Sequence, residues 1–195
     1  MRRWHTAVAG AVGLLMSASL AGAQGTEGAT RRPLDFGLLG GLSMPMGDFG
    51  DVAKLGFHIG GFGAARLSET SPIKIRAELV YNRFGAEGFE DVGEIEVDGN
   101  YSILSITGNA VYDLPAEGMV RPYVMGGLGL YRFTANVDAD IPGAGDVDSS
   151  ASETEFGFNI GGGLNFQLSG FSTFVEIRYH SADADYIPIS FGIRF

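Results

Sequence analysis

Eight consecutive stretches of alternating apolar and polar residues constrain the fold of this chain more than any other feature of its sequence. Alternation with a period of two places successive side chains on opposite faces of a β-strand. Most of these stretches contain about ten to fourteen residues. Ordinary strands contain about five or six, whereas a tilted strand that crosses a membrane needs about nine to eleven. The pattern predicts strands over 34–44, 55–67, 73–84, 101–114, 120–133, 154–168, 171–181 and 186–195.

The alternation separates an apolar face from a charged face. In the third stretch, Ile75 and Leu79 share one face, while Arg76 and Glu78 share the other. Such charges are costly in a dry soluble core, but a polar interior is expected inside a barrel whose outside faces lipid. The sequence therefore predicts a lumen charge cluster. Its members come from the third, seventh and eighth strands: Arg76, Glu78, Glu176, Arg178 and Arg194.

Long and short connections alternate along the chain. The connections after the first, third and fifth strands are long, at 45–54, 85–100 and 134–153, whereas the others contain five residues or fewer. Long outer loops with short periplasmic turns are typical of outer-membrane barrels. An even number of strands then brings both ends of the barrel to the periplasmic side. The fold class that we predict is all-β, an eight-stranded antiparallel up-and-down transmembrane β-barrel over residues 34–195.

The tyrosines add a second indication of a membrane. All seven lie near the ends of the predicted strands, where amphipathic rings form girdles at the lipid headgroup level. They are Tyr81, Tyr101, Tyr112, Tyr123, Tyr131, Tyr179 and Tyr186.

The first 23 residues have the layout of an export signal. Arg2 and Arg3 precede a mild apolar stretch, and Ala21-Gly22-Ala23 forms a cleavage site before Gln24. The apolar stretch is too short to span a bilayer. We predict a cleaved signal peptide over 1–23, followed by a flexible lead-in over 24–33.

The last predicted strand carries a family resemblance. Residues 186–195 read YIPISFGIRF, an alternating strand that finishes on Phe195. The segments 121–131 and 161–166 are rich in glycine, as are the central strands of the barrels that this chain resembles. The chain resembles the small OmpA/OmpX-type outer membrane protein beta-barrel domain family, which is porin-like. The resemblance implies a bacterial outer membrane, contact with its lipids and lipopolysaccharide, and assembly by the barrel-assembly machinery that reads Phe195. It implies no single activity.

Composition excludes several classes of function. The chain has no cysteine and a net charge of −10, which argues against thiolate metal sites and against nucleic-acid binding. Its glycine clusters lie within strands and complete no phosphate-binding motif, so we expect no cofactor. His180 and Ser181 are adjacent in a strand and therefore point to opposite faces, which disfavours a lipid-modifying enzyme of the kind that needs both groups at its rim.

Acidic residues gather in the long connections. Residues 85–100 and 134–153 contain many carboxylates and no basic residue. A solvated, mutually repelling surface is one interpretation. Weak capture of divalent cations, which would bridge to lipopolysaccharide, is another. The candidate metal ligands are Asp138, Asp140, Asp146 and Asp148.

These observations favour a monomeric, non-enzymatic barrel with a structural or surface-interaction role and acidic extracellular loops. The alternatives are a narrow porin-like channel for ions or small solutes and, third, a lipid-modifying enzyme.

Overall fold

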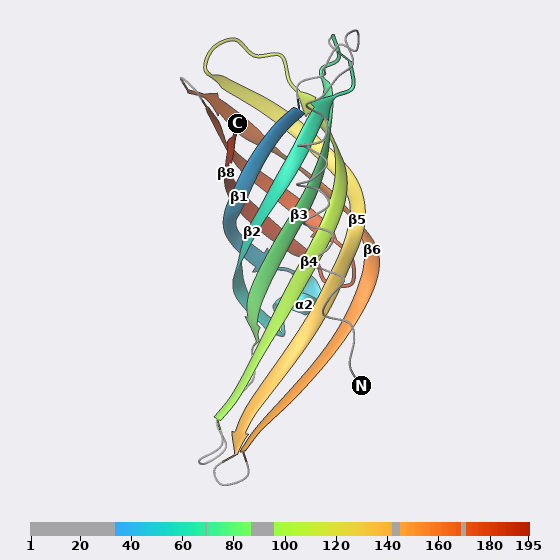
Figure 1. Ribbon diagram of the computed structural model, residues 1–195, viewed down its shortest axis with the longest axis vertical. Coiled ribbons are helices and arrows are strands. Elements are labelled where there is room, and N and C mark those ends of the chain that lie inside the picture. Colours follow the sequence, from blue (N-terminus) through green and yellow to red (C-terminus); the bar gives the residue numbers. More distant parts are fainter. Residues whose placement is uncertain (1–33, 69, 87–95, 142–144, 169–170) are drawn as a thin grey trace, which may run out of the picture. The chain divides into compact units, whose positions relative to one another are not determined.

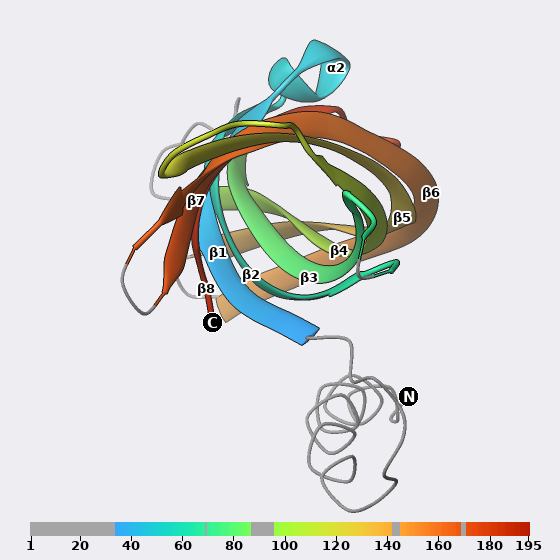
Figure 2. The same ribbon diagram turned by 90° about the horizontal axis from the view of Figure 1, so that it is seen from above.

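The computed structural model describes residues 34–68, 70–86, 96–141, 145–168 and 171–195, with the backbone alone at 96–98, 138–141 and 145–148. In this part of the chain, eight strands form one closed antiparallel barrel, as the alternation predicts (Figure 1; Figure 2). Each strand pairs with its sequence neighbours, and β8 closes against β1. The strands are β1 (Leu34–Pro45), β2 (Ala53–Arg66), β3 (Ile73–Ala86), β4 (Glu96–Asp113), β5 (Val120–Ile141), β6 (Gly145–Gln167), β7 (Ser172–Ser181) and β8 (Tyr186–Arg194).

The two ends of the barrel differ in their connections. At the turn end, short connections join β2 to β3, β4 to β5 and β6 to β7, and Gly37 of β1 pairs there with Arg194 of β8. The expectation that both ends of the barrel lie on one side is therefore confirmed. The opposite end, here called the loop end, carries the short helix α2 (Gly47–Gly50). Gly47 has φ = 57°, a left-handed conformation that glycine adopts without strain. No helix among the described residues is long and apolar enough to cross a membrane.

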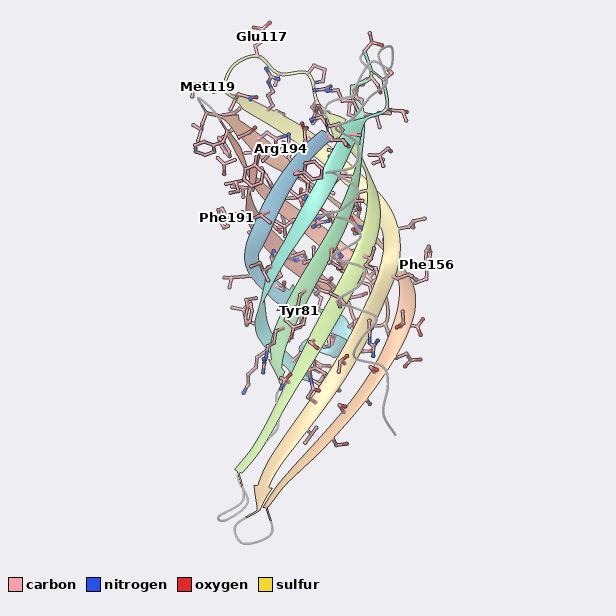
Figure 3. All side chains as sticks on the ribbon, in the orientation of Figure 1. Tyr81, Glu117, Met119, Phe156, Phe191 and Arg194 are labelled. Carbon is pink, nitrogen blue, oxygen red and sulfur yellow. The ribbon has the colours of Figure 1, made fainter. Side chains whose placement is uncertain are left out.

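The outer face of the barrel is apolar. Figure 3 shows Tyr81, Phe156 and Phe191 projecting away from the strands, and Phe156 and Ile177 are 65% and 53% exposed. Between them along each strand lie side chains that point into the lumen. The faces predicted for β3 are confirmed by this alternation of exposed and buried residues, and β6, β7 and β8 alternate in the same way.

Strands β4, β5 and β6 are longer than predicted. β5 and β6 contain 22 and 23 residues, and their pairing continues from Phe133↔Glu153 to Ile141↔Gly145. The interpretation of 134–153 as a loop was therefore wrong, and part of 85–100 is also strand. The reason is that strand pairing does not stop at the membrane surface. We call the part of β4–β6 that lies farther toward the loop end than Tyr101, Phe133 and Glu153 the extension. It reaches past the other strands in Figure 1.

The predicted tyrosine girdle is only partly present. Tyr81 and Tyr112 are exposed on the outer face. Tyr123, Tyr131 and Tyr186 are instead buried inside the barrel, at 2%, 0% and 1% exposure. Their strand parity explains the difference, because each lies an even number of residues from a lumen-facing neighbour on its own strand.

Candidate functional site

Two arginines and two glutamates meet inside the barrel and form what we call the charge ring. Arg76 and Glu78 come from β3, and Glu176 and Arg178 come from β7. Arg76 Nη1 lies 2.8 Å from Glu176 Oε2, Arg178 Nε lies 2.8 Å from Glu176 Oε1, and Arg178 Nη1 lies 2.5 Å from Glu78 Oε2. Arg76 also contacts Glu78 directly. Each arginine thus binds both glutamates, and the ring is neutral overall.

The charge ring lies across the lumen. β3 and β7 are separated by three strands in either direction around the closed barrel, so they form opposite walls. All four side chains are at most 3% exposed. An eight-stranded barrel has an interior just wide enough for side chains to fill. The charge ring therefore occupies the central cross-section of the lumen.

Neutral groups complete the coordination of the two glutamates. The Tyr123 hydroxyl donates to Glu176 Oε2 at 2.6 Å. Thr107 Oγ1 and Asn109 Nδ2 donate to Glu78 Oε2 at 3.3 and 3.2 Å. Such bonds offset the cost of removing the carboxylates from water. These three partners were not predicted from the sequence, although all of them lie at lumen-facing positions of β4 and β5.

Aromatic rings pack against the charge ring. The Arg76 guanidinium lies 4.0 Å from the centre of the Phe62 ring, a cation–π contact. Phe62 and Phe174 contact each other edge to face. The ends of these two rings lie where Gly37 and Gly192 would carry a Cβ atom. Glycine at these positions therefore makes room for large lumen side chains.

Arg194 lies apart from the charge ring, which corrects its predicted place in the cluster. Its Nη2 donates to Asn165 Oδ1 at 3.1 Å, and among the described residues no carboxylate lies within ion-pairing distance of it. This separation follows from the position of Arg194 at the turn end of β8, where it pairs with Gly37. Glu176 pairs with Ser190, which lies two lumen-facing positions farther from the turn end. Lys74 similarly binds Asp113 at 2.6 Å.

A second polar cluster surrounds His58. Ser43 Oγ lies 3.0 Å from His58 Nδ1 and donates to Asn82 Oδ1 at 2.8 Å. Ser190 Oγ lies 2.9 Å from His58 Nε2. A serine beside a histidine is an arrangement that nucleophilic catalysis uses. All four side chains are at most 3% exposed, however, so no substrate reaches them in this conformation.

His180 and Ser181 point to different faces, as their adjacency requires. His180 is buried in the lumen, with Nδ1 3.1 Å from the Tyr131 hydroxyl and its ring stacked on Tyr186. Ser181 lies on the opposite face of β7. The two residues therefore form no catalytic pair in this structure.

An apolar layer closes the lumen toward the loop end. Phe84, Ile103, Tyr131 and Tyr186 are each at most 1% exposed and belong to one cluster. Phe49 of α2 packs on this cluster, with its ring 5.1 Å from that of Phe84. The charge ring is thus separated from the loop end by packed hydrophobic side chains.

The candidate metal ligands lie at the tip of the extension. The register pairs Asp138 with Asp148 and Asp140 with Asp146. On the other side of β5 it pairs Asp138 with Asp98 and Asp140 with Glu96. Their side chains are outside the described residues. In the part of the chain whose side chains are described, no group of three histidines or carboxylates is arranged to hold a metal ion.

A model of the outer membrane protein beta-barrel domain matches residues 8–195. The chain belongs to this family. The family places this barrel in the bacterial outer membrane, as the resemblance implies. A comparison with curated protein sequences finds no match.

Solved structures that are similar to this chain include several outer-membrane proteins. Neisserial surface protein A has 18% identity, with 83% of this chain and 95% of that chain covered and a TM-score of 0.50. A major outer membrane protein from Thermus thermophilus has 10% identity, 83% and 98% coverage and a TM-score of 0.55. Ail, the attachment invasion locus protein of Yersinia pestis, has 16% identity, 83% and 98% coverage and a TM-score of 0.44. At these identities the likeness concerns the fold.

Proposed function

We propose that this outer-membrane barrel is a non-enzymatic surface protein that binds an extended, basic segment of a partner along the free edge of its extension. The observation that carries the proposal is the register of β6. Its pairing with β7 begins at Phe158↔Ser181, whereas its pairing with β5 continues to Gly145. Residues 145–157 thus have a strand partner on one side and, among the described residues, none on the other.

A free strand edge presents backbone donors and acceptors to which another strand can add. Natural proteins protect such edges with lysine, proline or bulges. Residues 149–152 of β6 read Ser-Ser-Ala-Ser, without any of these features, and all four are exposed. This stretch is therefore suited to strand addition.

The charge of the extension determines which partner fits. Rows of carboxylates cross the extension at Asp98, Asp138 and Asp148 and at Glu96, Asp140 and Asp146. Directly opposed like charges destabilise a sheet, and a basic segment or divalent cations would relieve that repulsion. A second copy of the chain would instead bring acid against acid. This repulsion between copies favours a monomer.

The filled lumen supports this role over transport. The charge ring crosses the interior, and the apolar layer of Phe84, Ile103, Tyr131 and Tyr186 lies between it and the loop end. The burial of Ser43, His58 and Ser190 likewise supports a non-enzymatic role. We further infer that residues 1–23 are removed on export and that the barrel-assembly machinery recognises Phe195. We also infer that the loop end lies on the outer side of the membrane, which carries lipopolysaccharide.

The test uses the refolded barrel in nanodiscs and a synthetic peptide of alternating lysine and valine. We expect the peptide to bind and to slow amide hydrogen exchange at residues 149–157. A variant in which a two-residue turn replaces 136–150 removes the opposed carboxylates and residues 145–150 of the free edge, and it should therefore bind the peptide much more weakly. The control peptide has proline at alternate positions and cannot form a strand. Equal binding of both peptides, or of the trimmed variant, would contradict the proposal.

A further inference from the structure

A hollow of about 430 Å³ lies at the loop end, at the base of the extension. Its size is within the range of small-molecule sites, about 300–1,000 Å³. Four elements and two connections form it: α2, the start of the extension in β4, β5 and β6, Val52 between α2 and β2, and the segment between β7 and β8. Its lining includes aromatic and acidic side chains: Asp48, Phe49, Tyr101, Phe133, Glu153 and Asp183.

The floor of the hollow is aromatic and held in place. The Phe49 ring contacts Phe84 and Tyr101 edge to face, with centroids 5.1 and 5.7 Å apart. Phe49, Tyr101 and Phe133 all pack on the buried cluster that closes the lumen. Because these rings are already positioned, a ligand that stacks on them would not have to order them first.

The walls of the hollow are negatively charged. Asp48, Glu153 and Asp183 are exposed, and no lining residue is basic. Two basic residues among the described ones adjoin the wall: Arg132 donates to Ser152 Oγ at 3.2 Å through an exposed bond, and Arg83 pairs across the strands with Ser102. Three carboxylates against these two guanidinium groups leave the hollow with an excess of negative charge.

We propose that this hollow binds a small soluble organic cation, an ammonium or guanidinium group on an apolar stem. The cation would lie over the faces of the aromatic rings and near the carboxylates, and both interactions favour positive charge. An anion would be repelled by the walls, and a bare metal ion would gain nothing from the aromatic floor. The site does not depend on strand addition to β6, because its floor belongs to α2, β4 and β5.

The probe that we choose is benzylammonium, and benzyl alcohol serves as its neutral control. Both are titrated into isotope-labelled barrel in nanodiscs, and backbone amide shifts are followed by NMR. We expect saturable shifts of the backbone amide signals at Phe49, Tyr101 and Phe133 with benzylammonium. Benzyl alcohol should bind at least about tenfold more weakly. Equal affinity for the two probes, or shifts confined to other parts of the barrel, would overturn the proposal.

Two sets of variants separate this site from general attraction by an acidic protein. The double variant Asp48→Asn/Asp183→Asn should weaken benzylammonium binding about three- to tenfold, because each exposed charge contributes modestly. Asp51→Asn, on the residue after α2, and Glu117→Gln, at the turn end, remove the same type of charge outside the hollow and should leave binding unchanged. If Asp51→Asn weakens binding as much as the double variant, the hollow is not the site.

Discussion

Arg76 of β3 and Glu176 of β7 are 100 residues apart in the chain, yet their side chains meet inside the barrel with Nη1 and Oε2 2.8 Å apart. Both are almost completely buried. Removing ions from water is expensive, and only close pairing together with further hydrogen bonds compensates for it. The charge ring meets this condition because each charged group contacts two opposite charges. It thereby joins the two walls of the barrel and fills the space between them.

Replacing Glu176 by glutamine should strongly destabilise the barrel. The variant keeps the shape of the side chain but leaves Arg76 and Arg178 facing Glu78 alone, so the lumen gains an uncompensated positive charge. We expect the free energy of unfolding to fall by about 3–5 kcal/mol. Urea-dependent unfolding of the refolded protein in lipid measures this.

The double variant Glu176→Gln/Arg178→Gln is the matched control for this change. It restores neutrality, so we expect it to be more stable than Glu176→Gln alone, a coupling that a double-mutant cycle detects. Glu117→Gln, at the exposed turn end, should change stability by less than about 0.5 kcal/mol. A double variant less stable than the single one would show that the four charges do not act as a unit.

A charge placed on the outer face should lower the free energy of unfolding, and the loss should be larger nearer the middle of the membrane. Ile177, 53% exposed on β7, lies in the middle of the outer wall, whereas Phe171 lies on the same face at the turn end. Ile177→Arg should cost about 2–4 kcal/mol and Phe171→Arg about 0–1 kcal/mol. The same unfolding experiment compares them. Equal losses would mean that the assignment of the outer face or of the membrane position is wrong.

Deletion of Phe195 should reduce assembly in the outer membrane. Its backbone bonds to Phe36 of β1, with N–O distances of 2.9 and 3.4 Å, and its ring is the feature that we expect the assembly machinery to read. Phe195→Ala keeps the backbone bonds and removes only the ring. If recognition of the ring matters, both variants should accumulate less than the wild type in membrane fractions. Wild-type levels of Phe195→Ala would instead leave barrel closure as the role of this residue.

The mature protein should begin at Gln24. The Ala21-Gly22-Ala23 sequence supports cleavage at this point. Intact-mass spectrometry of protein extracted from the outer membrane gives the answer directly. A mass that still includes residues 1–23 would refute the export signal.

The alternation of residues in β3, β6, β7 and β8 was sufficient to predict the strands and their faces. With a side-chain period of two, the only choice left for each strand is which face points into the lumen. The extension was missed for a specific reason. The segment Ala135–Ile141 alternates small or apolar residues with asparagine and aspartate, which is itself a strand pattern. The carboxylates of 134–153 favour a solvated loop, but the pairing of β5 with β6 continues through this segment to Ile141↔Gly145.

The charge ring was predictable in part. The alternation of side chains predicts that Arg76, Glu78, Glu176 and Arg178 point into the lumen. Because β3 and β7 form opposite walls of a narrow barrel, these side chains can meet across it. The place of Arg194 near the turn end was also predictable, because it lies at the end of the last strand. Its hydrogen bond to Asn165 was not predictable, because it depends on the register between β6, β7 and β8. The hydrogen bond from Tyr123 to Glu176 was not predictable either, because it depends on the register that pairs both residues with Gly163 of β6. The Tyr123 ring lies where a Cβ atom at Gly163 would be.

The central claim is that the charge ring and the packing around it close the lumen, so that this barrel acts at its surface and not as a pore. Planar-bilayer recording on the refolded wild-type protein tests it most directly. We expect no steady conductance above that of the protein-free bilayer over the range of voltages that the bilayer tolerates. Steady, nanosiemens-scale open channels from the wild type would contradict the claim.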